Sequence, residues 1–229
     1  FTPEGKPTAN PQRKAASRTL NRMCLLVLAQ AGASILWQFL LVFGMASLGA
    51  GSLDGMAISW LSAALVPLST ALPFFLYMAI GRRDTVDYLK FQRVGFFPGL
   101  LCVLAGLSLA QLANYPTFMF QEFLQGFGYE SASAALDGGA KTWGGFALDF
   151  AVVAVMVPFL EEFAFRGVLV SALRPYGIGF AIVASALVFG FAHLDGPTSL
   201  FAILAGLVLG FIYARTNNLW LTIWIHALN

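Results

Sequence analysis

Charged residues are scarce in this sequence. Lys, Arg, Asp and Glu make up 10% of the chain, against about 25% in an ordinary soluble domain, while 59% of the residues are hydrophobic. The formal net charge is only +2, and no sizeable polar domain stands outside the apolar stretches. The composition therefore predicts a membrane protein and argues against a nucleic-acid partner.

Cysteine and histidine are equally rare, and several catalytic signatures are missing. Cys24 and Cys102 both lie in apolar stretches and suggest no disulfide framework. The H-E-x-x-H sequence of many zinc proteases is absent. The G-x-S-G and G-x-G-D sequences of serine and aspartyl intramembrane proteases are absent as well. The only histidines, His193 and His226, both fall in apolar segments.

Apolar runs of about 20 residues, the length that a helix needs to cross a bilayer, recur along nearly the whole chain. We therefore expect an all-α polytopic transmembrane bundle with about seven spans, the last of which continues beyond residue 229. The expected spans are residues 23–48, 56–80, 94–120, 143–173, 178–193, 199–214 and 219 onward. They form one membrane domain, with a polar cytoplasmic tail (1–22), N-terminal helices (23–142) and helices with the ionisable residues (143–229).

The basic residues predict the orientation of the bundle. Loops on one side hold Lys6, Arg13, Lys14, Arg18, Arg22, Arg82, Arg83, Lys90, Arg93, Arg174 and Arg215. Loops on the other side hold Asp54, Glu122, Glu130, Asp137, Lys141 and Asp195. Because cytoplasmic loops carry the excess of Lys and Arg, we expect the N-terminus in the cytoplasm. The short loops favour a bacterial cytoplasmic membrane.

An ionisable cluster lies inside the fourth apolar run. Each such group costs roughly 2.5–3.5 kcal/mol on insertion scales, so several together indicate a shared function. Glu162 and Arg166 are four residues apart and can pair, with Arg166 in a supporting role. Glu161 points about 100° away from Glu162 and is the freer carboxylate. Counting helical rise from the turns places Glu161 and His193 at one depth, with His226 roughly 10 Å nearer the cytoplasm.

This set of residues predicts hydrolysis. A carboxylate and an imidazole can hold an attacking water, and a second imidazole can stabilise an oxyanion. One alternative is zinc, held by Glu161, His193 and His226. A second alternative is a structural ion cluster in a non-catalytic protein, and a third is a proton relay in a transporter.

Three short motifs resemble those of a known family. They are E-E-x-x-x-R from Glu161 to Arg166, F-x-x-x-H from Phe189 to His193, and an H-x-x-x-N-like end from His226. In this order, each within an apolar segment, they resemble the CAAX protease and bacteriocin-processing family, also called the Abi family. The chain departs from the pattern at its end, because Asn229 comes three residues after His226 rather than four.

The resemblance implies an all-helical intramembrane endopeptidase. It implies that Glu161 and His193 hold the attacking water, and that His226 and the motif's asparagine form an oxyanion hole. A metal-free mechanism is favoured over a zinc enzyme. The expected substrate is a peptide or a membrane protein, prenylated or not, met in the lipid bilayer. The alternative is an immunity, scaffold or structural subunit that keeps the protease fold and packs against other membrane subunits.

Overall fold

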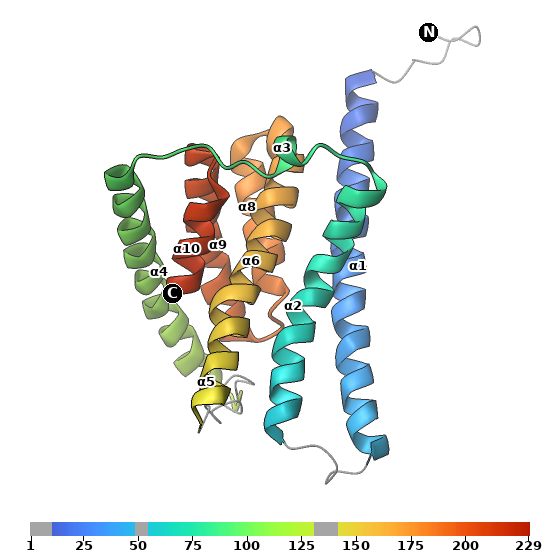
Figure 1. The fold of residues 1–229 in the computed structure, drawn as a ribbon, viewed down its shortest axis with the longest axis vertical. Coiled ribbons are helices and arrows are strands. Elements are labelled where there is room, and N and C mark those ends of the chain that lie inside the picture. Colours follow the sequence, from blue (N-terminus) through green and yellow to red (C-terminus); the bar gives the residue numbers. More distant parts are fainter. Residues whose placement is uncertain (1–10, 49–54, 131–141) are drawn as a thin grey trace, which may run out of the picture.

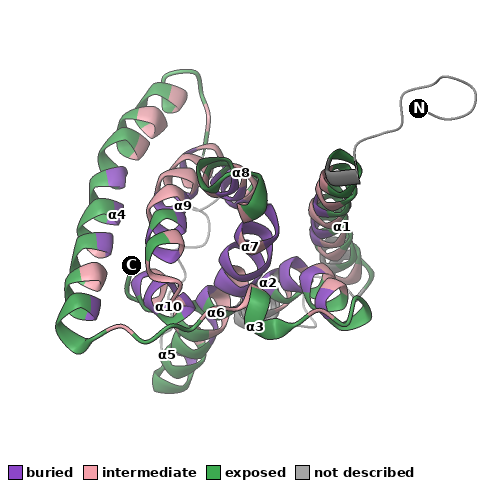
Figure 2. Cartoon of the chain, turned by 90° about the horizontal axis from the view of Figure 1, so that it is seen from above, coloured by how far each residue is buried: buried purple, intermediate pink, exposed green. Residues whose placement is uncertain are grey.

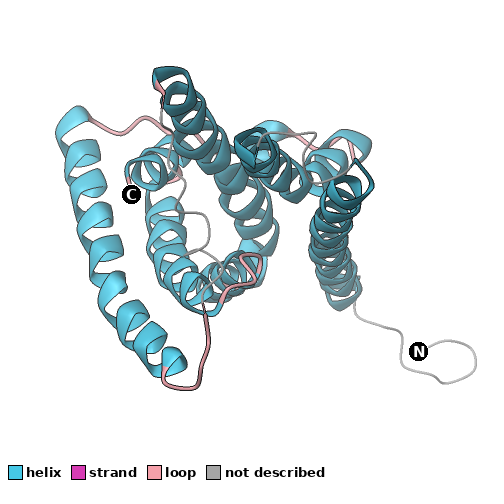
Figure 3. Cartoon of the chain, turned by 90° about the horizontal axis from the view of Figure 1, so that it is seen from below, coloured by secondary structure: helices cyan, strands magenta, loops and turns pink. Residues whose placement is uncertain are grey.

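The computed structural model describes residues 11–48, 55–130 and 142–229. Within these ranges every regular element is a helix, and one isolated bridge joins Phe91 to Asn218 (Figures 1 and 3). The α-helices are α1 (Pro11–Leu48), α2 (Gly55–Ile80), α3 (Thr85–Tyr88), α4 (Phe96–Gln125), α5 (Trp143–Asp149), α6 (Val157–Glu162), α7 (Ser171–Leu173), α8 (Ile178–Phe191), α9 (Gly196–Thr216) and α10 (Leu219–Leu228). The predicted all-α class is confirmed.

Four helices are long and apolar enough to cross a membrane: Arg13–Leu40, Phe96–Gln125, Trp143–Tyr176 and Gly196–Thr216. Three shorter apolar helices, Pro67–Ile80, Ile178–Phe191 and Leu219–Leu228, correspond to the remaining expected spans. The chain is therefore an integral membrane helical bundle. Over the residues whose side chains are described, four of the seven expected spans are long and apolar enough to cross a membrane, and Pro67–Ile80 is the part of α2 for which this could be judged.

Two helix boundaries differ most from the expectation. The first helix begins at Pro11, so residues 11–22 of the expected polar tail are helical. No breaker follows Pro11, and proline is well tolerated in the first turn of a helix. The helix expected to end near residue 120 continues to Gln125, because Gln121 and Glu122 are compatible with a helix. The expected loop residues Lys6, Asp54, Asp137 and Lys141 lie outside the described ranges.

The third long span is a composite helix. Two π-helical segments, Phe150–Met156 and Phe163–Val170, join α5, α6 and α7 into one continuous rod. The second π segment starts directly after Glu162, and every one of its residues is buried. Seen from above, α6 to α10 form a closed group with α4 on one side and α2 and α1 on the other (Figure 2). The glutamate-bearing helix therefore lies inside the bundle.

Helices α8 and α9 pack closely through small residues. A methyl group added at Gly206 would lie 3.1 Å from Ala186, and one at Gly210 would lie 3.1 Å from Ile182. The G-x-x-x-G sequence in α9 thus permits close helix packing, as in many membrane helix pairs. This contact fixes α8, which precedes His193, against α9.

The connection from α2 to α4 crosses one end of the bundle. Ser171 donates to the carbonyl of Tyr88 at 2.8 Å, and the amide of Leu219 donates to the carbonyl of Lys90 at 2.9 Å. Arg174 donates to the carbonyl of Ala214 at 2.6 Å. These bonds tie the ends of α7, α9 and α10 together, and they fix the level at which α10 starts.

Candidate active site

A buried ion pair anchors the site. Arg166 Nη1 lies 2.6 Å from Glu162 Oε1, and both side chains are fully buried. The second guanidinium nitrogen, Nη2, donates to the carbonyl of Gly206 at 3.5 Å, and the guanidinium carbon lies 4.5 Å from the ring centre of Phe189. The predicted pairing across four residues is thus observed. Arg166 is enclosed by protein groups, and its ion pair fixes the position of the Glu162 carboxylate.

His226 reaches both glutamates. Its Nδ1 lies 3.1 Å from Glu162 Oε1, the oxygen that also accepts from Arg166. Its Nε2 lies 3.7 Å from Glu161 Oε2, too far for a direct hydrogen bond and compatible with a bridging water. A carboxylate only accepts hydrogen bonds, so the contact with Glu162 implies that Nδ1 carries a hydrogen. The imidazole is thereby oriented with Nε2 toward Glu161.

The sequence analysis expected straight helices to leave His226 roughly 10 Å nearer the cytoplasm than Glu161 and His193. For the glutamates this expectation was wrong, because His226 lies 3.1 Å from Glu162 and 3.7 Å from Glu161. That expectation used the α-helical rise from Glu161 to the turn at Pro175. The eight residues Phe163–Val170 form a π-helix instead. Its i→i+5 bonds put more residues into each turn, so the chain advances less per residue. The π segment therefore brings the glutamates closer to the turns and accounts for part of the expected gap.

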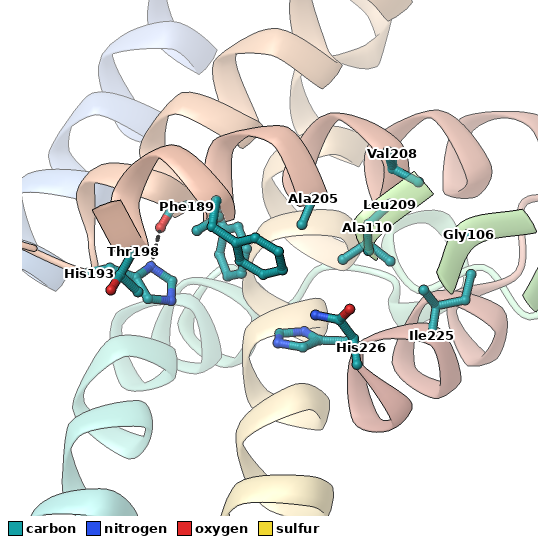
Figure 4. A pocket seen from close by; sticks show the side chains of 13 residues that line it. Gly106, Ala110, Phe189, His193, Thr198, Ala205, Val208, Leu209, Ile225 and His226 are labelled. Atoms are coloured by element: carbon teal, nitrogen blue, oxygen red, sulfur yellow. Dashed lines mark hydrogen bonds between the residues drawn. The ribbon is translucent and has the colours of Figure 1, made fainter. Parts of the chain in front are cut away.

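His193 lies on the other side of Phe189. It lies two residues after the end of α8, and its Nδ1 lies 2.9 Å from the carbonyl of Phe189, which leaves Nε2 available. The Phe189 ring centre is 5.1 Å from that of His193 and 5.8 Å from that of His226, both edge to face. Figure 4 shows Phe189 between the two imidazoles. Among the described residues, His193 has no carboxylate within 4.0 Å, so His226 is the imidazole nearer to Glu161.

Both histidines line one cavity (Figure 4). Its water-accessible volume of about 70 Å³ is several times the roughly 10–15 Å³ that one water molecule needs. Most of the wall is apolar, as in small-molecule sites generally. The polar lining residues are His193, Thr198, His226 and Asn229. The cavity can therefore hold water beside two imidazoles.

The two glutamates differ in accessibility. The side chain of Glu162 is fully buried, whereas 14% of the Glu161 side chain remains exposed. Glu161 also has no Arg or Lys within 4.0 Å in the part of the chain that is described. The prediction that Glu161 is the freer carboxylate agrees with this arrangement.

The three side chains proposed for zinc are not gathered as a ligand set. Within the described ranges, no group of three or more His, Cys, Asp and Glu side chains is placed to hold a metal ion. Glu161 and His226 are close, but the Phe189 ring lies between His226 and His193. A zinc site of this composition does not fit the arrangement, and the dependence on metal stays a prediction to be tested.

Sequence reasoning missed two contributors, the ring of Phe189 and the side chain of Gln111. Phe189 was named only as the first residue of F-x-x-x-H, one helical turn before His193, and its contacts with both imidazoles were not predicted. Gln111 of α4 donates to Asn229 Oδ1 at 3.3 Å and accepts from Asn114. No local pattern signals Gln111, because the contact depends on α4 packing beside α10. Asn229 thus lines the cavity with a partner from a distant helix.

Comparison with known proteins adds an independent line of support. Residues 143–229, which contain the two complete motifs and the H-x-x-x-N-like end, match the sequence model of a family described as "Type II CAAX prenyl endopeptidase Rce1-like". The chain is also 29% identical over 132 residues to the protein named "Putative membrane peptidase YdiL" from Bacillus subtilis (strain 168). That alignment covers 56% of this chain and 52% of the relative, so it spans about half of the relative's length. No solved structure matches the chain.

The matched region coincides with the helices that build the site. Residues 143–229 run from the start of α5 to the end of α10, and they include the ion pair, both histidines and Phe189. The membrane helices, the motif order and the family match therefore agree with one another. Residues 143–229 are therefore similar in sequence to the CAAX protease family, and the chain that carries them is an integral membrane helical bundle.

Proposed function

We propose that the protein is an intramembrane endopeptidase in which Glu161 activates the attacking water. The observation that carries the proposal is the placement of His226, held by Glu162 through Nδ1 with Nε2 3.7 Å from Glu161, at the edge of a cavity large enough for water. A carboxylate beside an oriented imidazole is the arrangement expected of general acid–base catalysis.

The proposed reaction is ordinary peptide hydrolysis. Glu161 takes a proton from a water molecule as the water oxygen attacks the carbonyl carbon of the scissile bond. The carbonyl oxygen becomes an oxyanion. Collapse of this intermediate breaks the carbon–nitrogen bond, and the proton held by Glu161 passes to the leaving amine. The products are a free carboxyl group and a free amino group, so atoms and protons balance.

The two imidazoles take different parts in this proposal. His226 is oriented by Glu162 and lies next to two carboxylates, which would compensate the charge of its protonated form. In that form Nε2–H is a donor suited to the oxyanion. His193 donates its Nδ1–H to the carbonyl of Phe189, which leaves Nε2 free to accept a hydrogen bond from a water molecule in the cavity. Glu162 and Arg166 are positioning residues that act through His226.

The substrate is proposed only as a class. The family and the relative are both named as peptidases, and the site lies on membrane-embedded helices. A peptide or membrane protein that reaches the cavity from the bilayer or its surface is therefore the proposed substrate. A prenyl group on that substrate belongs to the family's printed name, and its requirement here is a matter for experiment.

Substitution Glu161→Gln tests the proposal. The purified chain in lipid nanodiscs is incubated with an internally quenched peptide that ends in a CAAX sequence, with and without a farnesyl group. We expect cleavage by the unaltered protein and a loss of at least about 10²-fold in E161Q. Glu122→Gln provides the matched control, because Glu122 is an exposed glutamate on α4, outside the site.

The result also separates a protease from a scaffold. E161Q removes a proton acceptor but preserves the size of the side chain, so a scaffold or structural subunit should keep its cellular role. Equal cleavage by E161Q and E122Q would contradict the assignment of Glu161. Loss of cleavage in both variants would point to a general effect on the fold rather than to the chemistry of one carboxylate.

A further inference from the structure

An apolar groove runs between α1 and α2, well away from the catalytic cavity. Its water-accessible volume is about 660 Å³. Leu25 and Ala29 of α1 and Leu72 and Leu76 of α2 line it, and these leucines are 65%, 53% and 48% exposed, respectively. Figure 1 shows the two helices side by side at the edge of the bundle. In a membrane, this groove is open to lipid.

One end of the groove is basic. Arg22 of α1 and Arg83, just after α2, both line it, together with Tyr77. The groove becomes apolar from Arg22 toward Ala29, a distance of roughly 10 Å along the helix at 1.5 Å per residue. It thus combines a cationic end with an apolar channel, which matches the chemistry of an anionic phospholipid with its acyl chain.

Arg83 is held in place at this end. Its guanidinium carbon lies 4.0 Å from the ring centre of Tyr77, and Nη1 donates to the hydroxyl of Tyr88 at 3.2 Å. Its Nε is buried without a hydrogen-bond partner. In the described part of the chain, neither Arg22 nor Arg83 has a carboxylate within 4.0 Å. Two cations without counter-ions therefore flank the mouth of the groove, and one of them is preordered.

We propose that this groove binds one anionic phospholipid, with its phosphate between Arg22 and Arg83 and an acyl chain along Leu25, Ala29, Leu72 and Leu76. Arginine forms strong hydrogen bonds with phosphate, and basic pockets between membrane helices suit anionic headgroups. The lipid fills apolar space that no described residue covers, and it supplies the missing negative charge.

Native mass spectrometry of the purified chain tests this proposal. The protein is exchanged into detergent with equal amounts of phosphatidylglycerol and phosphatidylcholine that carry the same acyl chains. We expect one phosphatidylglycerol to be retained in preference to phosphatidylcholine. Arg22→Gln and Arg83→Gln should each lower this preference by about fivefold. Ala29→Phe, which fills the apolar part of the groove, should lower retention of both lipids.

Arg93→Gln is the matched control, because Arg93 is exposed at the same end of the bundle and does not line the groove. Equal losses in R93Q and R22Q would mean a diffuse surface charge effect and would overturn the proposal. Equal retention of the two lipids would overturn it as well. Displacement of the lipid by millimolar sodium phosphate would show a site for free phosphate instead. R22Q alone keeps the test decisive if R83Q fails to fold.

Discussion

The Nδ1 atom of His226 lies 3.1 Å from Oε1 of Glu162, although 64 residues separate them in the sequence. The same oxygen accepts a hydrogen bond from Arg166 at 2.6 Å. The side chains of Arg166, Glu162 and His226 thus form a line of polar contacts that runs from the buried centre of the bundle to the edge of the cavity. Because these polar contacts lie in an apolar interior, they should affect both the stability of the fold and the orientation of the His226 imidazole.

The first prediction concerns the buried ion pair. Glu162→Gln leaves Arg166 charged and fully buried without its counter-ion, which should destabilise the fold by about 3–5 kcal/mol. Replacement of both residues, as Glu162→Met with Arg166→Leu, removes both charges and should restore most of the stability. Thermal unfolding in detergent measures each effect. A double variant as unstable as E162Q would show that the charges themselves are needed.

The same pair of variants separates stability from orientation. In the double variant His226 has lost the acceptor that fixes its Nδ1, so peptide cleavage should stay low even though the fold recovers. Cleavage is measured with the quenched peptide under conditions where both proteins are folded. Recovery of cleavage together with stability would contradict the proposed role of Glu162 in orienting His226.

The second prediction concerns Phe189. Its ring contacts the guanidinium of Arg166, both imidazoles and the ring of Phe165, so Phe189→Leu removes four aromatic contacts but keeps an apolar side chain in place. A desolvated cation–π contact is worth about 2 kcal/mol. We expect F189L to lose stability by about that amount and to show a lower kcat with little change in KM.

Phe201 provides the control for this substitution. It lines the same cavity, and the described residues show no ring contact between it and either histidine. Phe201→Leu should therefore change kcat much less than F189L. Equal effects of the two substitutions would mean that the cavity responds to any loss of aromatic volume, and Phe189 would then have no separate positioning role.

The third prediction tests the packing that positions His193. A methyl group added at Gly190 would lie 2.2 Å from Ile203 Cγ1 and 2.7 Å from the carbonyl oxygen of Ser199, a backbone atom that cannot rotate away. Gly190→Ala should therefore destabilise the protein by about 1–3 kcal/mol. On the same helix, a methyl group at Gly179 would have no neighbour within 4 Å. Gly179→Ala should be neutral or slightly stabilising, and thermal unfolding compares the two.

The sequence predicted the helices well and the site less well, for a physical reason. Apolar runs and turn residues determine where helices occur, so the end of the long span near Leu173 and the start of the next at Ile178 agree with the structure. The Glu162–Arg166 pair follows from helical spacing alone. The contact between His226 and Glu162 does not, because it depends on how α6 and α10 pack against each other, and the π-helix after Glu162 that contributes to this arrangement has no simple sequence signature.

The last prediction concerns orientation, which we propose from the basic residues. Arg93 and Glu130 are both exposed and flank α4 at its two ends, so they should lie on opposite sides of the membrane. In a variant with Cys24 and Cys102 replaced by serine, single cysteines are placed at Arg93 or Glu130 and treated with a membrane-impermeant maleimide. In intact cells Glu130→Cys should react, whereas Arg93→Cys should react only after permeabilisation.

The reverse pattern would place the basic end of the bundle, including Arg22 and Arg83, on the outer side of the membrane. Reaction of both positions in intact cells would mean that α4 does not span the bilayer.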